Sequence, residues 1–145
     1  MRIPLDFDRD GGSIFVNAAI RIRSRSVLFP VAFIVDTGSP MTFIDEFYSS
    51  KFRIFAKNLP FDSFIYMGGT KVGLYALDGT EVILRDDRGV PTGLSFDGMK
   101  VAKTAWTKRE AVYTGESILG LDFMRKLGLV LFVDPGNNLA YLEKK

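Results

Sequence analysis

One stretch of the chain, VAFIVDTGSPMTFID at residues 31–45, combines residue types that can do chemistry. An apolar run stops at Asp36, Thr37 and Ser39 add hydroxyl groups, and Gly38 permits a tight turn with close backbone approach. The same residue types build ordinary turns, so an aspartate that only caps its own turn is one interpretation. The apolar segments on both sides favour another, because a carboxylate held between buried strands needs a partner or a function.

The chain has no histidine and no cysteine. Their absence excludes Ser-His-Asp and Cys-His catalysis, thiolate chemistry and most zinc sites. A catalyst made from this sequence must therefore use carboxylates, lysine, tyrosine, hydroxyl groups or the backbone. We expect no cofactor and no metal, and the lack of cysteine fits a reducing compartment.

Length and charge set the class of protein. The 145 residues fit one domain, residues 1–145, and the net charge of +2 gives only weak support for nucleic-acid binding. The N-terminal MRIPLDFDRDGG carries charges where a signal peptide needs an apolar core, and the longest apolar run is too short to span a membrane. We therefore expect a soluble, cytoplasmic protein that binds neither nucleic acid nor membrane.

The hydrophobic pattern around this stretch is mostly that of strands. Residues 13–24 alternate apolar and polar, which predicts a half-buried strand, and residues 27–35 are apolar on both faces, which predicts a central strand with Pro30 near its start. Residues 45–60 fit a short helix or a packed loop. The one clear helix is LDFMRKLG, with Gly128 as its stop, and a closing hairpin follows it. The sequence thus predicts an all-β barrel or sandwich with one short C-terminal helix.

Three segments carry a resemblance to a known family. AFIVDTGSPMTFID resembles the catalytic loop of the aspartic proteases, with Asp36, Thr37 and Gly38 as its triplet. SILGLDFMRKLGLVLFV resembles the second hallmark of the retroviral-type members, and FIYMGGTKVGLYAL between them resembles the flap that closes over the substrate. The chain is therefore similar to the retropepsin-like aspartic proteases from about Val31 to Leu142. The resemblance implies a retropepsin-like acid protease β-barrel with its active site at a homodimer interface.

The single Asp-Thr-Gly has a consequence within that family. Pepsin-like enzymes are about twice this length and carry two triplets, so one triplet resembles the arrangement in which two identical subunits each give one Asp36. Two carboxylates about 3 Å apart repel by roughly 5 kcal/mol at an effective dielectric of ~20, so they share one proton. The resemblance implies an aspartic endopeptidase whose charged carboxylate activates water while the protonated one donates to the substrate carbonyl.

Other residues take supporting roles by the same resemblance. Thr37 is expected to hydrogen-bond across the dimer axis, and Gly38 and Ser39 to support the loop. The expected flap tip comprises Met67, Gly68 and Gly69, and the residues expected beneath the loop and along the subsites are Ile118, Leu119 and Gly120. Asp122 is expected as a helix cap and Asp86 as a turn residue.

Rival functions remain open at this point. A dimeric β-barrel of the same fold that binds proteins or peptides without cutting them is the main alternative. A haloacid-dehalogenase phosphatase also has an aspartate after an apolar strand, but it needs a second Asp where this chain has Gly38. A nucleic-acid-binding barrel has only the mild basicity and the 13 phenylalanines in its favour. The expected partners are a peptide or unfolded protein substrate and a second copy of the chain.

Overall fold

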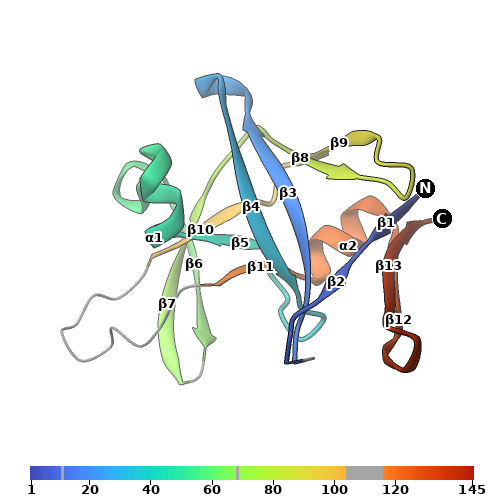
Figure 1. Ribbon diagram of the computed structural model, residues 1–145. Coiled ribbons are helices and arrows are strands. Elements are labelled where there is room, and N and C mark those ends of the chain that lie inside the picture. The colour runs from blue at the N-terminus through green and yellow to red at the C-terminus, as the bar shows by residue number, and fades with distance from the viewer. Residues whose placement is uncertain (11, 68, 104–115) are drawn as a thin grey trace.

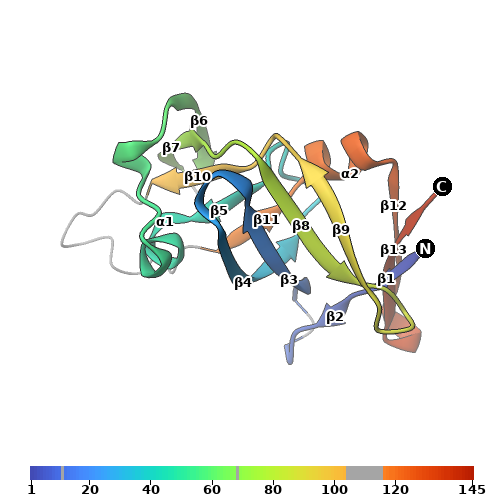
Figure 2. The same cartoon turned by 90° about the horizontal axis from the view of Figure 1, so that it is seen from above.

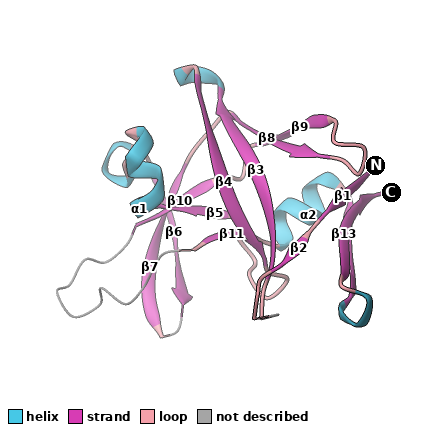
Figure 3. Ribbon diagram, in the orientation of Figure 1, coloured by secondary structure: helices cyan, strands magenta, loops and turns pink. Residues whose placement is uncertain are grey.

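The computed structural model describes residues 1–10, 12–67, 69–103 and 116–145, and within them it is mostly strand with two short α-helices (Figures 1 and 3). The strands are β1 (Arg2–Pro4), β2 (Asp6–Phe7), β3 (Ile14–Ile22), β4 (Val27–Val35), β5 (Phe43–Asp45), β6 (Phe61–Met67), β7 (Thr70–Ala76), β8 (Thr80–Arg85), β9 (Pro91–Phe96), β10 (Lys100–Lys103), β11 (Ser117–Leu119), β12 (Leu129–Asp134) and β13 (Leu139–Lys144). The helices are α1 (Glu46–Ser49) and α2 (Leu121–Leu127).

The larger sheet has the order β6-β7-β10-β5-β11-β4-β3-β8-β9, with β2 paired to β3. Most neighbours are antiparallel, whereas β11 runs parallel to β4 and β10 runs parallel to β5. Strand β11 lies between β4 and β5 in the sheet, although both strands precede it in the sequence. The segment that joins β4 to β5 must therefore pass over the end of β11.

The predicted barrel is not closed. In the described part of the chain, β6 and β9 end the sheet path and each pairs with one neighbour. The two hairpins that contain them lie on opposite sides of the central strands (Figure 1). Alternating hydrophobicity predicts strands and their buried faces, but it does not predict whether the two outermost strands meet.

Strand β3 confirms its predicted alternation, because Val16, Ala18, Ile20 and Ile22 are buried. Strand β4 differs from its prediction. It is central in the sheet order, but β11 pairs only with residues 33–35, so among the described residues no strand lies on the other side of residues 27–32. Leu28 is accordingly 58% exposed, and Pro30, which has no N–H to donate, lies in this unpaired part.

The ambiguous segment 45–60 contains α1 followed by two 3₁₀ turns, Ser50–Phe52 and Ala56–Asn58. Helix α2 confirms the predicted C-terminal helix and ends at Gly128, whose φ of 62° and N–H bond to the Arg125 carbonyl form a left-handed cap. Neither helix of the described residues is long and apolar enough to cross a membrane.

A second, three-stranded sheet has the order β1-β13-β12 and brings the two chain ends side by side (Figures 1 and 2). Strands β12 and β13 form the predicted closing hairpin, joined by a 3₁₀ turn at Pro135–Asn137. Its inner face buries Ile3 and Leu142 in the main core. On its outer face Phe132 stacks on Tyr141 with ring centroids 4.8 Å apart.

The apolar interior has two parts. The main core lies beneath β3, β4, β8 and α2, and its largest fully buried side chains include Phe29, Phe33 and Phe123. A smaller cluster joins the inner face of the β6–β7 hairpin to the central strands; its buried members are Phe43, Val72, Leu74, Ala102 and Ile118. This smaller cluster fixes the hairpin beside the loop that follows β4.

Candidate active site

The candidate site is the loop of residues 36–42, which connects β4 to β5 across the end of β11. Three backbone hydrogen bonds fix its path. The Asp36 N–H donates to the Leu119 carbonyl at 3.1 Å, the Ser39 N–H donates to the Asp36 carbonyl at 3.2 Å, and the Leu121 N–H donates to the Ser39 carbonyl at 2.9 Å. The loop is therefore held by β11 and by the start of α2.

Asp36 lies exposed at the end of buried β4. Its Oδ1 accepts the Gly38 N–H at 2.8 Å, which orients the carboxylate along the turn. Within the described residues, Oδ2 accepts no hydrogen bond and the side chain forms no ion pair. One oxygen of Asp36 is thus oriented by its own loop, while the other is open to a ligand.

The hydroxyl groups of the loop differ. Ser39 Oγ donates to the Met41 carbonyl at 2.8 Å, so this hydroxyl stabilises the loop from inside. Thr37 is exposed, and its hydroxyl forms no hydrogen bond with the described part of the chain. Gly38 is close to the carboxylate, since a Cβ there would stand 3.1 Å from Asp36 Oδ1. Ser39 thus holds the loop from inside, whereas the Thr37 side chain is open to solvent.

Gly120 allows the loop to cross β11 at short range. A Cβ at this position would stand 2.5 Å from the Met41 carbonyl oxygen and 2.7 Å from that of Ser39. Both neighbours are backbone atoms, so neither can rotate away as a side chain would. Its φ of −100° is open to any residue, which means that glycine is needed here for space alone.

A buried polar contact joins the loop to α2. Thr42 is fully buried; its Oγ1 accepts the Gly120 N–H at 2.9 Å and donates to Asp122 Oδ1 at 2.6 Å. Asp122 was expected to cap the helix, but Gly120 is the N-cap residue and Asp122 lies inside the first turn. Its carboxylate is aimed at Thr42 and at the Phe123 N–H, 2.8 Å away. Asp122 therefore supports the loop through Thr42.

A cleft of about 420 Å³ separates the Asp36 loop from the β6–β7 hairpin. Its walls combine apolar side chains with polar groups, among them the Asp36 carboxylate, and its lining residues are Asp36, Gly38, Ser39, Pro40, Phe43, Ile65, Tyr66, Met67 and Ile118. A cleft of this shape can receive an extended chain whose apolar side chains face Phe43, Ile65 and Ile118.

The β6–β7 hairpin is the candidate flap. Met67 pairs with Thr70 at its tip. Gly69 has a φ of +82°, a conformation that favours glycine, and Gly68 lies outside the described residues. Ile65 and Met67 face the cleft and pack on the smaller apolar cluster. The hairpin therefore shares its anchoring residues, Phe43 and Ile118, with the wall of the cleft.

A second, larger cavity of about 690 Å³ adjoins Asp36 on the side away from the hairpin. It is lined by β2 and the loop after it, by the end of β4, and by the β12–β13 turn; its members include Arg9, Ile14, Asp36, Glu116, Ile118, Val133 and Pro135. Asp36 and Ile118 line both cavities, so the loop lies on the ridge between them.

The structure brings together most of the residues singled out in the sequence. Leu119 is fully buried and supports the loop through its carbonyl, and Ile118 is buried against the cleft. Sequence reasoning missed Thr42, Phe43 and Ile65. For Thr42 the signal was a hydroxyl between two apolar residues, Met41 and Phe43, just before β5.

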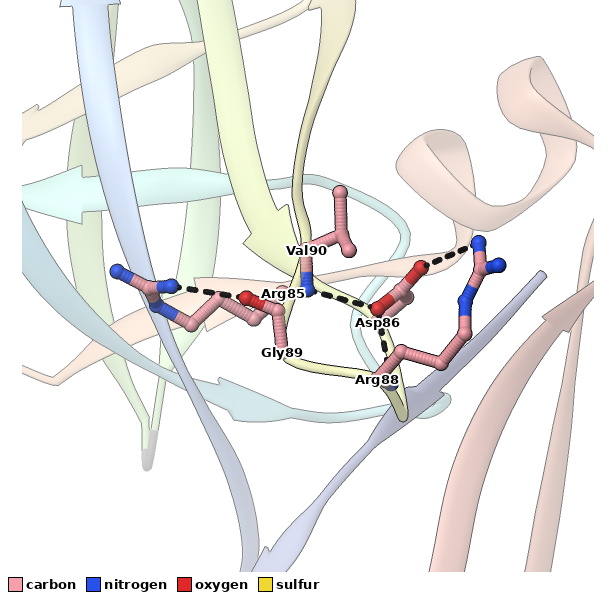
Figure 4. A network of polar contacts seen from close by, with 5 residues as sticks. All are labelled: Arg85, Asp86, Arg88, Gly89 and Val90. Carbon is pink, nitrogen blue, oxygen red and sulfur yellow. Dashed lines mark hydrogen bonds and ion pairs between the residues drawn. The ribbon is translucent and has the colours of Figure 1, made fainter.

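Asp86 forms a different kind of turn, as predicted for this residue (Figure 4). Its Oδ1 accepts the N–H groups of Val90 at 2.8 Å and Arg88 at 2.9 Å, and its Oδ2 pairs with the Arg88 guanidinium at 3.2 Å. The Val90 hydrogen bond, followed by those of Arg88, lowers the pKa of Asp86 below its ordinary value. No group of three or more acidic side chains in the described ranges is arranged to hold a metal ion.

Comparison with known proteins supports a relationship at the level of the fold. No family model and no curated protein matches the sequence. A retropepsin-like aspartic protease from Rickettsia conorii superposes with a TM-score of 0.63 at 17% identity, over 99% of this chain and 91% of that one. The EIAV protease in complex with the inhibitor HBY-793 gives a TM-score of 0.50 at 17% identity, over 87% of this chain and 98% of that one.

Proposed function

We propose, from the retropepsin-like fold that this chain has, that it is an aspartic endopeptidase in which residues 1–145 form one catalytic domain and two copies form one active site. The observation that carries this proposal is the state of Asp36. Its loop is fully held within one copy, yet one carboxylate oxygen and the neighbouring Thr37 hydroxyl have no partner in the described chain. These two groups are therefore free to bind a second copy of the chain or a substrate.

The chemistry follows from bringing two Asp36 carboxylates together. At a separation of about 3 Å their mutual repulsion favours a pair that holds one proton. The ionised carboxylate takes a proton from a water molecule, the water oxygen attacks the peptide carbonyl carbon, and the protonated carboxyl group donates its proton to the carbonyl oxygen, which gives a gem-diol. The C–N bond then breaks as the first carboxyl group gives its proton to the leaving nitrogen, and the second carboxylate takes back a hydroxyl proton, which restores a pair with one proton. Thr37 hydrogen-bonds between the two loops and fixes their spacing. The cleft beneath the β6–β7 hairpin holds the substrate in an extended conformation, with apolar residues on both sides of the cut bond.

The test is cleavage of an unfolded protein and of a mixed peptide library, with the Asp36→Asn variant as the matched control. The wild-type protein is expected to cut internal peptide bonds with a bell-shaped pH profile and an acidic to near-neutral optimum, because the pair must hold one proton. Asp36→Asn is expected to fold and to be inactive. Equal cleavage by both proteins would remove Asp36 from the mechanism.

A non-proteolytic module of the same fold that binds proteins or peptides is the second candidate, and the cleft beside the β6–β7 hairpin, with Phe43, Ile65 and Ile118 in its walls, is the observation in its favour. It predicts saturable binding of unfolded peptides by wild type and by Asp36→Asn alike, with no cleavage by either. The two candidates are thus separated in one experiment.

A further inference from the structure

We propose that the outer face of the β6–β7 hairpin is a second binding surface for the polypeptide substrate, outside the cleft that holds the cut bond. This surface is formed by the side chains of Phe61, Phe64, Tyr66 and Tyr75, which together make up the aromatic face. The proposal rests on the proposed function and narrows its substrate class to long, unfolded chains that carry apolar side chains beyond the cleft.

Exposed aromatic side chains concentrate on β6. In the described part of the chain, the aromatic residues among the exposed large hydrophobic ones are Phe47, Phe61, Phe64, Tyr66 and Phe132, and the middle three lie on this strand. Phe61 and Phe64 are each 52% exposed, and Tyr66 is 73% exposed. Single exposed apolar residues are ordinary, whereas a group of adjacent ones marks a surface that binds another molecule.

A β-bulge brings two of these rings together. Phe61 and Phe64 are three positions apart, and a regular strand would place them on opposite faces. The register shifts between Phe61 and Ser63, so both rings lie on the outer face, with their centroids 4.8 Å apart. Phe61 also meets Tyr75 of β7 edge-on, with centroids 5.6 Å apart. The irregularity in β6 thus gathers aromatic rings on one face of the hairpin.

Gly73 gives these rings a flat support. It lies opposite Phe64 in the register, and a Cβ there would stand 3.2 Å from the Tyr75 ring and 3.7 Å from the Phe64 ring. The two rings therefore lie over the backbone of β7. At the margin, Lys71 places its Nζ 4.0 Å from the centroid of the Phe64 ring. The aromatic face is thus a flat, largely apolar surface that apolar side chains of another chain can cover.

The three exposed rings are not needed to hold the hairpin in place. Its inner face anchors it, because Val72 and Leu74 are buried there in the smaller apolar cluster. Phe61, Phe64 and Tyr66 belong to neither apolar cluster of the described residues. Packing within one copy therefore does not account for these side chains, and they can be replaced while the anchoring contacts stay intact.

The aromatic face is continuous with the cleft, and this continuity identifies its occupant. Tyr66 lines the cleft that Asp36 also lines, and Phe64 is the next residue along the outer face. From Tyr66 to Phe61 the strand is about 16 Å long at ~3.3 Å per residue, so about five residues of extended chain cover it. A substrate chain that leaves the cleft past Tyr66 meets these rings within its next few residues. The occupant is therefore the substrate itself, held beyond the cut bond.

Three peptides test the proposal. The first is the shortest library peptide that the protein cuts or binds, and the second is the same peptide lengthened at both ends by about six residues that include Leu and Phe. We expect KM to be about tenfold lower for the second, with kcat nearly equal, because the added contacts hold the ground state and the transition state alike. The third peptide is lengthened with Gly and Ser only and is expected to behave like the first.

Substitutions on the aromatic face test which residues give this advantage. Phe61→Thr and Phe64→Thr, singly and together, remove the rings and keep side chains suited to a strand. We expect the double variant to raise KM for the long apolar peptide about tenfold and to cut the short peptide as wild type does. Leu28→Thr is the matched control, because it removes an exposed apolar side chain from β4, and it is expected to cut all three peptides as wild type. Sedimentation is measured on the same samples.

Binding to Asp36→Asn separates this proposal from the proposed function. By fluorescence anisotropy, this variant is expected to bind the long apolar peptide about tenfold tighter than the short one, and Phe61→Thr with Phe64→Thr to abolish the difference. If the wild type cuts no peptide but the difference in binding is present, the proposed function is wrong and the aromatic face still binds chains.

Two other results would overturn the inference. If the long apolar peptide has no advantage, or the double variant keeps it, the aromatic face does not bind substrate, while the proposed function stands. If the double variant changes the sedimentation of the protein and leaves the peptide KM values unchanged, the face is a contact between copies of the chain instead.

Discussion

The turns at Asp36 and Asp86 contain similar residues but leave their carboxylates in opposite states, one exposed and one buried. Both aspartates follow a strand, and both are followed by a glycine within three residues. Asp86 is 7% exposed, and its carboxylate is saturated by Val90 and Arg88 from its own turn. Asp36 is exposed, and among the described residues its carboxylate accepts one hydrogen bond, from the Gly38 N–H.

The two turns also differ in where their support comes from. Every hydrogen bond to the Asp86 carboxylate comes from within four residues. The Asp36 loop is held by Leu119 and Leu121, about eighty positions away, while Thr42 ties to Gly120 and Asp122. A structural turn can be self-contained, whereas a turn that keeps a carboxylate oxygen open must be fixed from elsewhere in the fold.

The largest expected effect comes from replacing each aspartate in turn. Asp36→Asn is expected to lower kcat by about 10³-fold or more with little change in Tm, because it removes the acid–base pair and no internal support. Asp86→Asn is expected to keep kcat and to lower Tm, because it weakens a saturated turn. Peptidase assays and thermal unfolding of both variants provide the measurement. Loss of activity in Asp86→Asn at an unchanged oligomeric mass would contradict a purely structural role for the Asp86 turn.

Gly120→Ala tests the support that reaches the Asp36 loop from outside. The added Cβ meets two backbone carbonyls at 2.5 and 2.7 Å, so the loop must shift. We expect a loss of about 1–3 kcal/mol in the free energy of unfolding and roughly 100-fold in kcat. Gly93→Ala is the control, because its Cβ meets only the movable end of the Glu81 side chain. Wild-type kcat in Gly120→Ala would show that the loop tolerates displacement.

Thr42→Val removes the hydroxyl that bridges Gly120 and Asp122 while keeping its size. We expect a loss of about 1–3 kcal/mol in the free energy of unfolding, because a buried N–H loses its acceptor and a carboxylate its donor. Activity is expected to fall about tenfold in kcat with KM nearly unchanged. Thr42→Ser keeps the hydroxyl and is expected to recover most of kcat. If Ser and Val behave alike, the hydroxyl does not position the loop.

The smallest effect is the pH dependence that Asp86 adds to stability. Its folded-state pKa lies below the unfolded value of about 3.9, so the ionised form is favoured by folding. The stabilisation is therefore complete above about pH 4 and is lost as the pH falls through the folded-state pKa. The difference in Tm between wild type and Asp86→Asn should amount to a few degrees near neutral pH and shrink in acid. A Tm difference that grows as the pH falls would contradict a lowered pKa of Asp86 in the folded protein.

The sequence was sufficient for the features that depend on near neighbours. The alternation in β3, the C-terminal hairpin, the α2 stop at Gly128 and the retropepsin-like fold all follow from short patterns. The exposed face of β4 was not predictable, because it depends on the length of β11, which pairs only at residues 33–35. The roles of Gly120 and Thr42 depend on β11 lying between β4 and β5, which no local pattern encodes.

The backbone of the Asp36 loop is held by hydrogen bonds within one copy of the chain. Under the proposed function, the loop is ordered when the chain folds, so the association of two copies would join surfaces that already have their final shape and would lose little further conformational freedom. Such partners can meet and separate quickly without unfolding. Activity would then depend on the concentration of the protein, because dilution would separate the two copies that form each active site while both copies stay folded.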